Sequence, residues 1–233
     1  MPELIVEERI TFASGPLRLA GVLAYPEETA PERAVLLCSP HPHFAGDMNN
    51  NVVSVVARRL AAHSVVLRFD YRGVGDSEIA LDSEESAFDY WTEVEETKDY
   101  TEAVTDVASA AQVLLEAVGS LDIEFSVVGY SFGAATGMLF ARGDDRVRRM
   151  VGIAPPLGRV SFEFLAGGGK PSLHLVGKKD SLYREDKVGE FRRLTQPAGR
   201  VVVLEEGDHF FRGDEDRLAQ EVEAFLREPC AAL

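Results

Sequence analysis

Short apolar runs and amphipathic stretches alternate along the chain, and this alternation predicts strands and helices in turn. Six nearly continuous apolar runs, typical of strands that helices cover on both faces, lie at 34–38, 65–69, 125–129, 150–154, 173–177 and 201–204. Two earlier runs, 4–12 and 17–25, predict an antiparallel hairpin. Patterns with a helical period separate the strands, at 48–62, 100–118, 132–141, 186–194 and 214–227.

This strand–helix–strand order predicts an α/β fold with a mostly parallel sheet of about eight strands, flanked by helices on both faces. We expect the first two strands to run antiparallel to the rest. Neither an internal repeat nor an interdomain linker is visible, so residues 1–233 are expected to form a single domain. Two connections, 76–99 and 155–170, are long for a compact domain, and long connections often act as lids or binding loops.

The amino-acid composition limits the classes of partner that the protein is expected to bind. Asp and Glu number 39 against 24 Lys and Arg, which gives a formal net charge of −15 at pH 7. Nucleic acid and anionic membrane surfaces are therefore not expected as partners, since both require basic patches. Two cysteines, Cys38 and Cys230, exclude a disulfide framework. The apolar runs are too short to span a bilayer and the start lacks signal-peptide features, so we expect a soluble, cytoplasmic protein.

The strongest chemical signal is Gly129-Tyr130-Ser131-Phe132-Gly133, which matches the pattern G-x-S-x-G. A predicted strand runs directly into a predicted helix here, with Ser131 at the turn. Such a turn lifts a serine oxygen out of the sheet, and its crowding requires small residues two positions before and after. We therefore interpret Ser131 as a nucleophile, the alternative being a structural serine.

A serine hydroxyl needs a base, and the base needs an orienting acid. Asp180 follows one late strand and His209 follows the last, so both are expected at the carboxyl edge of the sheet, where Ser131 emerges. The chain order Ser131, Asp180, His209 is the one expected of such a site. Asp208 competes as the acid, but it would have to fold back onto its neighbour, so Asp180 is preferred.

An acyl-transfer site also needs donors for an oxyanion. The backbone N–H of Phe132 is one candidate, because it follows the nucleophile at a helix N-terminus. A second donor is expected from the loop after the strand 34–38, where Pro42 has no N–H. His43 is the preferred candidate there, and Phe44 is the alternative.

Two other site types are weighed against this one. His41, His43 and Asp47 could be read as a metal site, but a third firm ligand is not evident. Gly73 and Gly75 lack the third glycine of a dinucleotide-binding loop. Neither a metal nor a cofactor is expected.

At this point the chain resembles the α/β-hydrolase superfamily along nearly its whole length. The motifs that carry the resemblance are the elbow 129–133, the block Phe69-Asp-Tyr-Arg-Gly-Val-Gly-Asp-Ser77, and the closing Gly207-Asp-His-Phe-Phe211. The pair His41-Pro42-His43 is similar to a group of small, largely uncharacterised bacterial members. The resemblance implies an α/β-hydrolase fold and a cofactor-free serine hydrolase. The chain differs from many members of the superfamily, because it has only the short connection 155–170 where they carry a large cap domain.

The substrate is expected to be a small acyl compound. Residues near the nucleophile expected to contact it, unless they merely pack the loops down, are Phe44, Trp91, Phe162, Phe164 and Phe210 in loops, and Tyr130 in the elbow. A carboxylic esterase or thioesterase is the favoured function. The alternatives are an acyltransferase, a peptidase or a C–C bond hydrolase with the same triad, or a non-catalytic binding protein. We expect the chain to act alone or as a homodimer.

The negative charge is concentrated in one segment. Residues 76–99 contain ten acids and a single base, Lys98, and so hold −9 of the net −15. One interpretation is a solvated, partly mobile loop. The sharper one is an acidic flap beside the site that disfavours anionic substrates and tolerates neutral ones.

Overall fold

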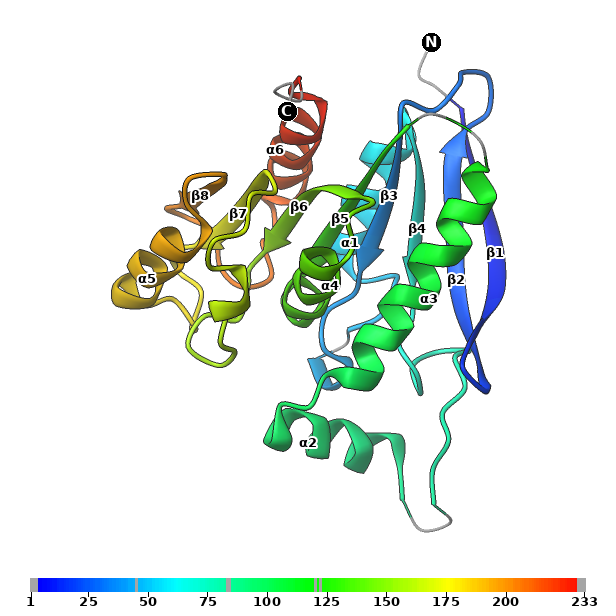
Figure 1. The fold of residues 1–233 in the computed structure, drawn as a ribbon, viewed down its shortest axis with the longest axis horizontal. Helices are drawn as coiled ribbons and strands as arrows, with labels where there is room; N and C mark the ends of the chain where they lie inside the picture. The colour runs from blue at the N-terminus through cyan, green and yellow to red at the C-terminus, as the bar shows by residue number, and fades with distance from the viewer. Residues whose placement is uncertain (1–3, 45, 83–84, 120, 122, 230–233) are drawn as a thin grey trace.

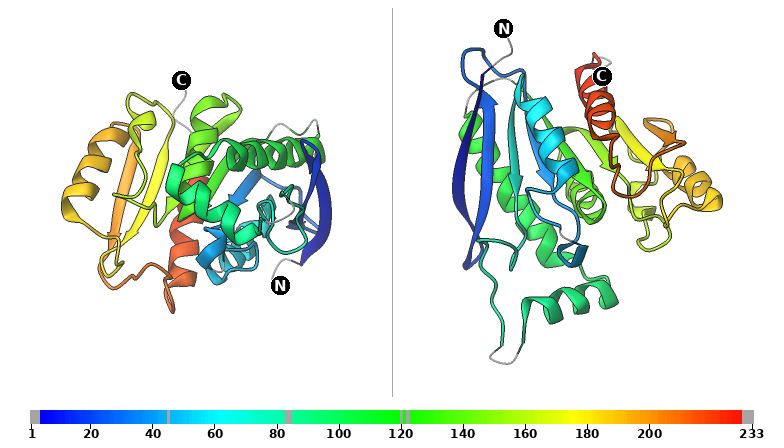
Figure 2. Two further views of the ribbon diagram at one scale, coloured as in Figure 1. Left: turned by 90° about the horizontal axis from the view of Figure 1, so that it is seen from below. Right: turned by 180° about the vertical axis from the view of Figure 1, so that it is seen from behind.

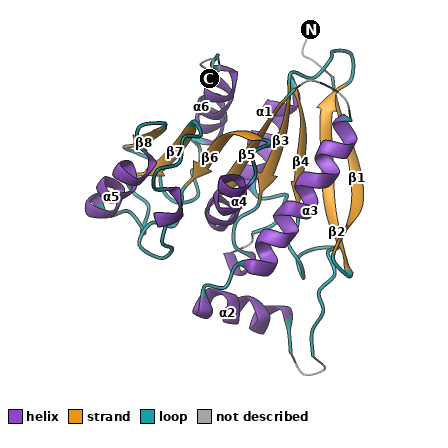
Figure 3. Cartoon of the chain, viewed as in Figure 1, coloured by secondary structure: helices purple, strands orange, loops and turns teal. Residues whose placement is uncertain are grey.

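One twisted eight-stranded sheet forms the centre of the described chain (Figures 1 and 3). The computed structural model describes residues 4–229 except 45, 83–84, 120 and 122, so Cys230 lies outside it. The strands are β1 (Ile5–Ser14), β2 (Leu17–Pro26), β3 (Arg33–Cys38), β4 (Ser64–Phe69), β5 (Glu124–Tyr130), β6 (Val147–Ile153), β7 (Ser172–Gly177) and β8 (Gly199–Leu204). Their order across the sheet is β1-β2-β4-β3-β5-β6-β7-β8, and all pairs from β4 to β8 are parallel.

The opening hairpin differs from the sequence prediction in its direction. β1 pairs antiparallel with β2, and β2 pairs antiparallel with β4. Two reversals cancel, so β1 points the same way as the parallel strands and only β2 opposes them. The prediction that both strands oppose the rest is wrong, because the two strands of a hairpin always run in opposite directions.

Helices cover both faces of the sheet, as expected (Figure 2). They are α1 (Asn51–Ala61), α2 (Ala87–Thr97), α3 (Thr101–Val118), α4 (Phe132–Gly143), α5 (Glu185–Thr195) and α6 (Glu215–Arg227). α1 and α6 bury apolar side chains such as Val56 and Leu218 on one face. α3, α4 and α5 bury side chains such as Leu114 and Phe191 on the other. The central strands are buried on both faces as a result, which explains their continuous apolar sequence.

The acidic segment 76–99 contains a helix that the sequence pattern did not predict. α2 starts with a capping box, in which the side chains of Ser86 and Asp89 each accept the other residue's backbone N–H. Trp91 and Val94 are buried on its inner side. In Figure 1 α2 lies beyond the carboxyl end of β3, the edge where the site is expected. Residues 83–84 of this segment lie outside the described residues.

The second long connection remains small. Between β6 and β7 the described chain adds only one short 3₁₀ helix, η2 (Glu163–Leu165), and no cap domain. Another such turn, η1 (Pro42–Phe44), follows β3. Within the described residues, no helix is both long enough and apolar enough to cross a membrane.

Candidate active site

Ser131 occupies a strained turn between β5 and α4. Its φ of 53° and ψ of −113° lie in a region that residues with a side chain rarely adopt. The turn is tight on both sides. A Cβ atom at Gly129 would lie 2.1 Å from the carbonyl oxygen of Gly133, and a Cβ at Gly133 would lie 2.2 Å from that of Cys38. Only glycine fits at these two positions, as the G-x-S-x-G pattern predicts.

The side chains of Ser131, His209 and Asp180 form one hydrogen-bonded chain. The Oγ of Ser131 lies 3.1 Å from Nε2 of His209, and Nδ1 of His209 lies 2.6 Å from Oδ2 of Asp180. A carboxylate only accepts, so Nδ1 carries the proton and Nε2 can accept the serine hydroxyl. The second oxygen of Asp180 accepts the N–H of Leu182 at 2.8 Å, which fixes the carboxylate. The Asp180 side chain is only 5% exposed.

The loop that carries His209 is held by two further contacts. Asp208, the competing acid, accepts the N–H of Phe210 at 2.9 Å within its own turn. Tyr130 donates its hydroxyl to the carbonyl of His209 at 2.8 Å. Tyr130 is buried and is not among the residues that line the pocket, so its contact is with the histidine loop.

The two candidate oxyanion donors differ in their surroundings. Phe132 is the first residue of α4, where an N–H has no acceptor within the helix and the helix dipole favours negative charge. The N–H of His43 instead donates to Nδ1 of His41 at 3.2 Å. The N–H of Phe44 donates to the carbonyl of His41 at 3.0 Å. The N–H of His43 or Phe44 would have to break its hydrogen bond to His41 before it could donate to an oxyanion.

A pocket of about 160 Å³ opens over Ser131. Two of the predicted contact residues, Phe44 and Phe210, lie in its wall beside Phe132 and His209. Its remaining lining residues are His41, Glu95, Tyr100, Pro156, Arg159, Val160, Ser181 and Leu182. Leu182, Val160 and Pro156 line the pocket together with three phenylalanines, so much of its wall is apolar.

Three other predicted contact residues lie outside this wall. Trp91 belongs to α2, not to a loop, and it is buried in the core with its indole N–H donating to the carbonyl of Arg72 at 3.1 Å. Phe162 packs against Phe191, with ring centroids 5.0 Å apart. Phe164 packs beside Phe162 at 5.8 Å. These aromatic side chains stabilise the two long connections.

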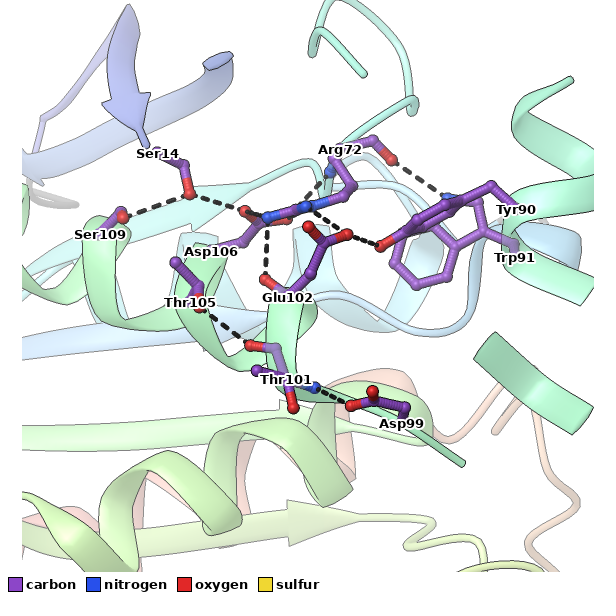
Figure 4. A network of polar contacts seen from close by, with 10 residues as sticks. All are labelled: Ser14, Arg72, Tyr90, Trp91, Asp99, Thr101, Glu102, Thr105, Asp106 and Ser109. Atoms are coloured by element: carbon purple, nitrogen blue, oxygen red, sulfur yellow. Dashed lines mark hydrogen bonds and ion pairs between the residues drawn. The ribbon is translucent and has the colours of Figure 1, made fainter. Parts of the chain in front are cut away.

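The network in Figure 4 explains how α2 reaches the pocket. The hydroxyl of Tyr90 donates to Glu102 on α3 at 2.7 Å, and Trp91 donates to Arg72 as described. Arg72 in turn binds Glu102 at 2.7 Å and Asp106 at 2.8 Å. Anchored in this way, α2 places Glu95 in the pocket wall.

Several of the lining residues could not be found by motif. Glu95 and Arg159 come from different connections and meet only in space, with 3.9 Å between the carboxylate and the guanidinium. Tyr100 precedes α3 and carries no motif. The sequence presents His41 as a candidate metal ligand and as part of the His41-Pro42-His43 motif after β3, and neither pattern predicts that it lines the pocket. The length of the connections 76–99 and 155–170 indicates that they contribute to a binding site, but it does not identify which of their residues line the pocket.

With this geometry in place, comparisons with known proteins identify the class. The family model described as the alpha/beta hydrolase family matches residues 35–175. The chain therefore belongs to the α/β-hydrolase family. The fold prediction made from the sequence is confirmed, and the chain is a hydrolase of this class.

Individual relatives agree with this assignment. An uncharacterised protein of Rickettsia prowazekii is 27% identical over 212 residues, which cover 87% of this chain and 82% of that protein. A solved structure from Agrobacterium tumefaciens, described as a putative α/β hydrolase of unknown function, is 26% identical with a TM-score of 0.74 and covers 95% of this chain and 94% of its own. An α/β serine hydrolase homologue from Coxiella burnetii is 25% identical with a TM-score of 0.77, covering 94% and 97%.

A more distant structure supports the fold without a cap. A protein of Xanthomonas campestris, described as an α/β serine hydrolase without lid, has a TM-score of 0.75 at 22% identity and covers 97% of both chains. At this identity the likeness concerns the fold alone. It matches the short connection that this chain has between β6 and β7.

Proposed function

We propose that this protein is a serine hydrolase that cleaves a carboxylic ester or thioester through an acyl-enzyme. The observation that carries the proposal is the hydrogen-bonded chain from Ser131 through His209 to Asp180, which starts at a strained turn and faces a pocket. A nucleophile, a base and an orienting acid in this geometry can attack an acyl carbonyl without a cofactor. The mostly apolar pocket wall suits an acyl or alcohol chain.

The proposed reaction uses each group in turn. His209 takes the proton of Ser131 as its oxygen attacks the acyl carbonyl, and Asp180 stabilises the imidazolium that forms. The N–H of Phe132 stabilises the developing oxyanion, a contribution of about 3 kcal/mol per donor in comparable sites. His209 then protonates the leaving alcohol or thiol. A water molecule, activated by His209, releases the acyl group and restores Ser131.

The prediction that His43 provides the second oxyanion donor remains a proposal. It requires the His43 N–H to exchange its contact with His41 for the oxyanion when substrate binds. Phe44 is the alternative and has the same requirement.

The decisive experiment combines a variant with a covalent probe. We expect Ser131→Ala to lose at least about a thousandfold in kcat/KM on p-nitrophenyl esters and acyl-CoA thioesters, because a whole triad member is removed. The variant should also lose labelling by a fluorophosphonate. Ser54→Ala, on α1 away from the pocket, is the matched control and should keep both. Undiminished turnover or labelling in folded Ser131→Ala would disprove the assignment.

The charge of the substrate is a second part of the proposal. α2 carries exposed carboxylates such as Glu93 and Glu96, and it stands at the carboxyl edge of the sheet. We propose that neutral esters are accepted more readily than anionic ones, because these carboxylates make the potential at the pocket mouth negative.

A further inference from the structure

Two buried polar groups in the pocket wall have no hydrogen-bond partner among the described residues. They are the hydroxyl of Tyr100 and the Nε2 atom of His41. The two residues are only 7% and 5% exposed. Buried polar atoms in folded proteins are nearly always paired, because an unpaired one loses its hydration without compensation. Other buried atoms, such as Ser126 Oγ and His174 Nδ1, also have no partner among the described residues, but these two belong to residues that line the pocket beside Ser131, where a bound molecule can supply the partner.

Both groups are donors. Nδ1 of His41 accepts the N–H of His43, so the proton of the neutral ring is on Nε2. This bond is kept during the reaction when Phe44, whose N–H binds the carbonyl of His41, is the second oxyanion donor in place of His43. Burial, reinforced by His43, lowers the pKa of His41 to about 4, and the ring is therefore neutral at pH 7. Burial, with the nearby charge of Glu95, raises the pKa of Tyr100 to about 12, so its hydroxyl keeps its proton. The Nε2–H of His41 requires an acceptor, and the Tyr100 hydroxyl can donate to one as well.

The two donors are placed beside the nucleophile. The rings of His41 and Tyr100 pack edge-on against the ring of Phe132, with centroids 5.0 Å and 5.4 Å away. Phe132 directly follows Ser131, and all four residues line the same pocket. A substrate whose carbonyl lies at Ser131 thus extends past the surface in which these donors are set.

The carboxylate in this wall does not pair with either donor. Glu95 binds Lys98 at 2.6 Å and pairs with Arg159 at 3.9 Å, both through Oε1, and among the described residues it forms no hydrogen bond with Tyr100 or His41. The neighbouring aromatic donors, in contrast, are satisfied within the fold. Trp91 donates to Arg72 and Tyr90 donates to Glu102. The structure therefore pairs the donors that anchor α2 and leaves the two pocket donors open.

We propose that Tyr100 and His41 form a donor subsite that binds a neutral acceptor oxygen of the substrate, such as a ketone, ether or second ester oxygen, remote from the bond that is cleaved. This inference rests on the proposed function and names its substrate class: oxygenated esters or thioesters rather than plain alkyl ones. Donors at fixed places in the pocket wall favour substrates that carry an acceptor oxygen within their reach.

Matched esters test the subsite. We compare kcat/KM for p-nitrophenyl hexanoate with that for p-nitrophenyl hexanoates carrying a ketone at carbon 4 or 5. In the wild type we expect one ketone ester to exceed the alkyl ester about tenfold, the effect of one or two hydrogen bonds. In Tyr100→Phe, which keeps the ring against Phe132, this ratio should fall to near one. Tyr25→Phe removes a hydroxyl that binds Glu8 on the opening hairpin, and it should keep the wild-type ratio.

Each contrary result has a defined meaning. Equal kcat/KM for alkyl and ketone esters in the wild type overturns the subsite, and so does a preference that survives in Tyr100→Phe. An equal fall for both esters in Tyr100→Phe also overturns it, because the hydroxyl would then act on the reacting carbonyl. The mono-p-nitrophenyl ester of adipic acid adds a charged arm. If it exceeds the ketone esters, the acceptor is a carboxylate and the neutral assignment is wrong.

A binding measurement separates this inference from the proposed function. Calorimetry compares the affinity of the N-butyl amides of hexanoic and 5-oxohexanoic acid for Ser131→Ala and for Ser131→Ala/Tyr100→Phe. We expect the ketone to strengthen binding about tenfold in the first protein only. Failure of Ser131→Ala to lose hydrolysis would disprove the proposed function, whereas identical binding of the two amides would disprove the subsite. Thermal unfolding of each variant checks that it folds.

Discussion

Gly133 illustrates how the absence of one atom allows the turn at Ser131. It lies in the first turn of α4 with an ordinary helical backbone, so the conformational freedom of glycine is not the reason that glycine is required at this position. A Cβ atom here would lie 2.2 Å from the carbonyl oxygen of Cys38 and 2.5 Å from that of Ser39. Both obstructing atoms are backbone and cannot swing aside. The requirement is for space alone.

We expect Gly133→Ala to destabilise the protein by about 1–3 kcal/mol and to reduce labelling of Ser131 by a fluorophosphonate. Overpacking of this kind moves backbone, whereas alanine would otherwise favour a helix. Urea unfolding and labelling rates measure the two effects. Gly143→Ala at the other end of α4 is the matched control, because its Cβ meets nothing within 4 Å. Equal stabilities of the two variants would contradict the steric explanation.

At the scale of single residues, the sequence is sufficient to locate those residues whose positions follow from the order and direction of the strands. Ser131, Asp180 and His209 each follow a strand, so knowing the strands suffices to bring them to one edge. The pocket wall is different, because Glu95 and Tyr100 reach it through the packing of α2 against α3. The two unpaired donors are visible only after every buried hydrogen bond has been assigned. That information is tertiary, and no spacing along the chain contains it.

Among the elements, α2 depends most on its anchor. Arg72 lies at the centre, binding Asp106 and Glu102 on α3 and accepting the indole N–H of Trp91 with its carbonyl (Figure 4). Asp106 is fully buried and also accepts the hydroxyl of Ser14 from β1. The network thus joins the hairpin, the loop after β4, α2 and α3. It holds the element that supplies Glu95 to the pocket.

We expect Arg72→Met to destabilise the protein by about 3–5 kcal/mol, because the Asp106 carboxylate would remain buried without its partner. The double variant Arg72→Met/Asp106→Leu should recover part of this loss, since it removes the stranded charge. Arg18→Met is the control: Arg18 and its partner Glu78 lie at the surface, where solvent screens an ion pair and its contribution to stability is small. Urea unfolding compares all three. If the double variant is no more stable than Arg72→Met, the buried charge is not the cause.

The helices and strands could be predicted from the sequence to the extent that their apolar residues recur with a regular period. The central strands were found because helices bury both faces, and α3 and α6 because an apolar stripe repeats along them. α2 was missed since acids surround its few buried positions, Trp91 and Val94. Its capping box at Ser86 and Asp89 is a local signal that could have revealed the start of the helix. The direction of β1 required only the geometry of a hairpin.

For the molecule as a whole, most of the net charge of −15 can be assigned to one region of the structure. The segment 76–99 that holds −9 of it contains α2, which is a packed helix in the described chain rather than an extended loop. Glu95 is turned into the pocket wall and paired with cations there. Glu93 and Glu96 remain exposed on the same helix. The acidity is therefore held in a fixed position beside the pocket, where it can act on an approaching substrate.

We expect Glu93→Gln/Glu96→Gln to raise kcat/KM for an anionic ester relative to a neutral one by about two- to fivefold at low salt, because repulsion at the pocket mouth is reduced. The neutral ester should change little. The gain should shrink at about 0.5 M salt, where screening shortens the range of the charges to well below 10 Å. Mono-p-nitrophenyl adipate and p-nitrophenyl hexanoate form a suitable pair of substrates.

The control removes two charges elsewhere. Glu27→Gln/Glu28→Gln changes the net charge equally, in exposed residues that follow β2. A local field predicts that only the α2 variant alters the ratio, since distant charges are screened before they reach the pocket. A general effect of net charge predicts that both variants alter it equally. An unchanged ratio in the α2 variant would show that its acids serve only to keep the helix solvated, and the preference for neutral esters would lose its basis.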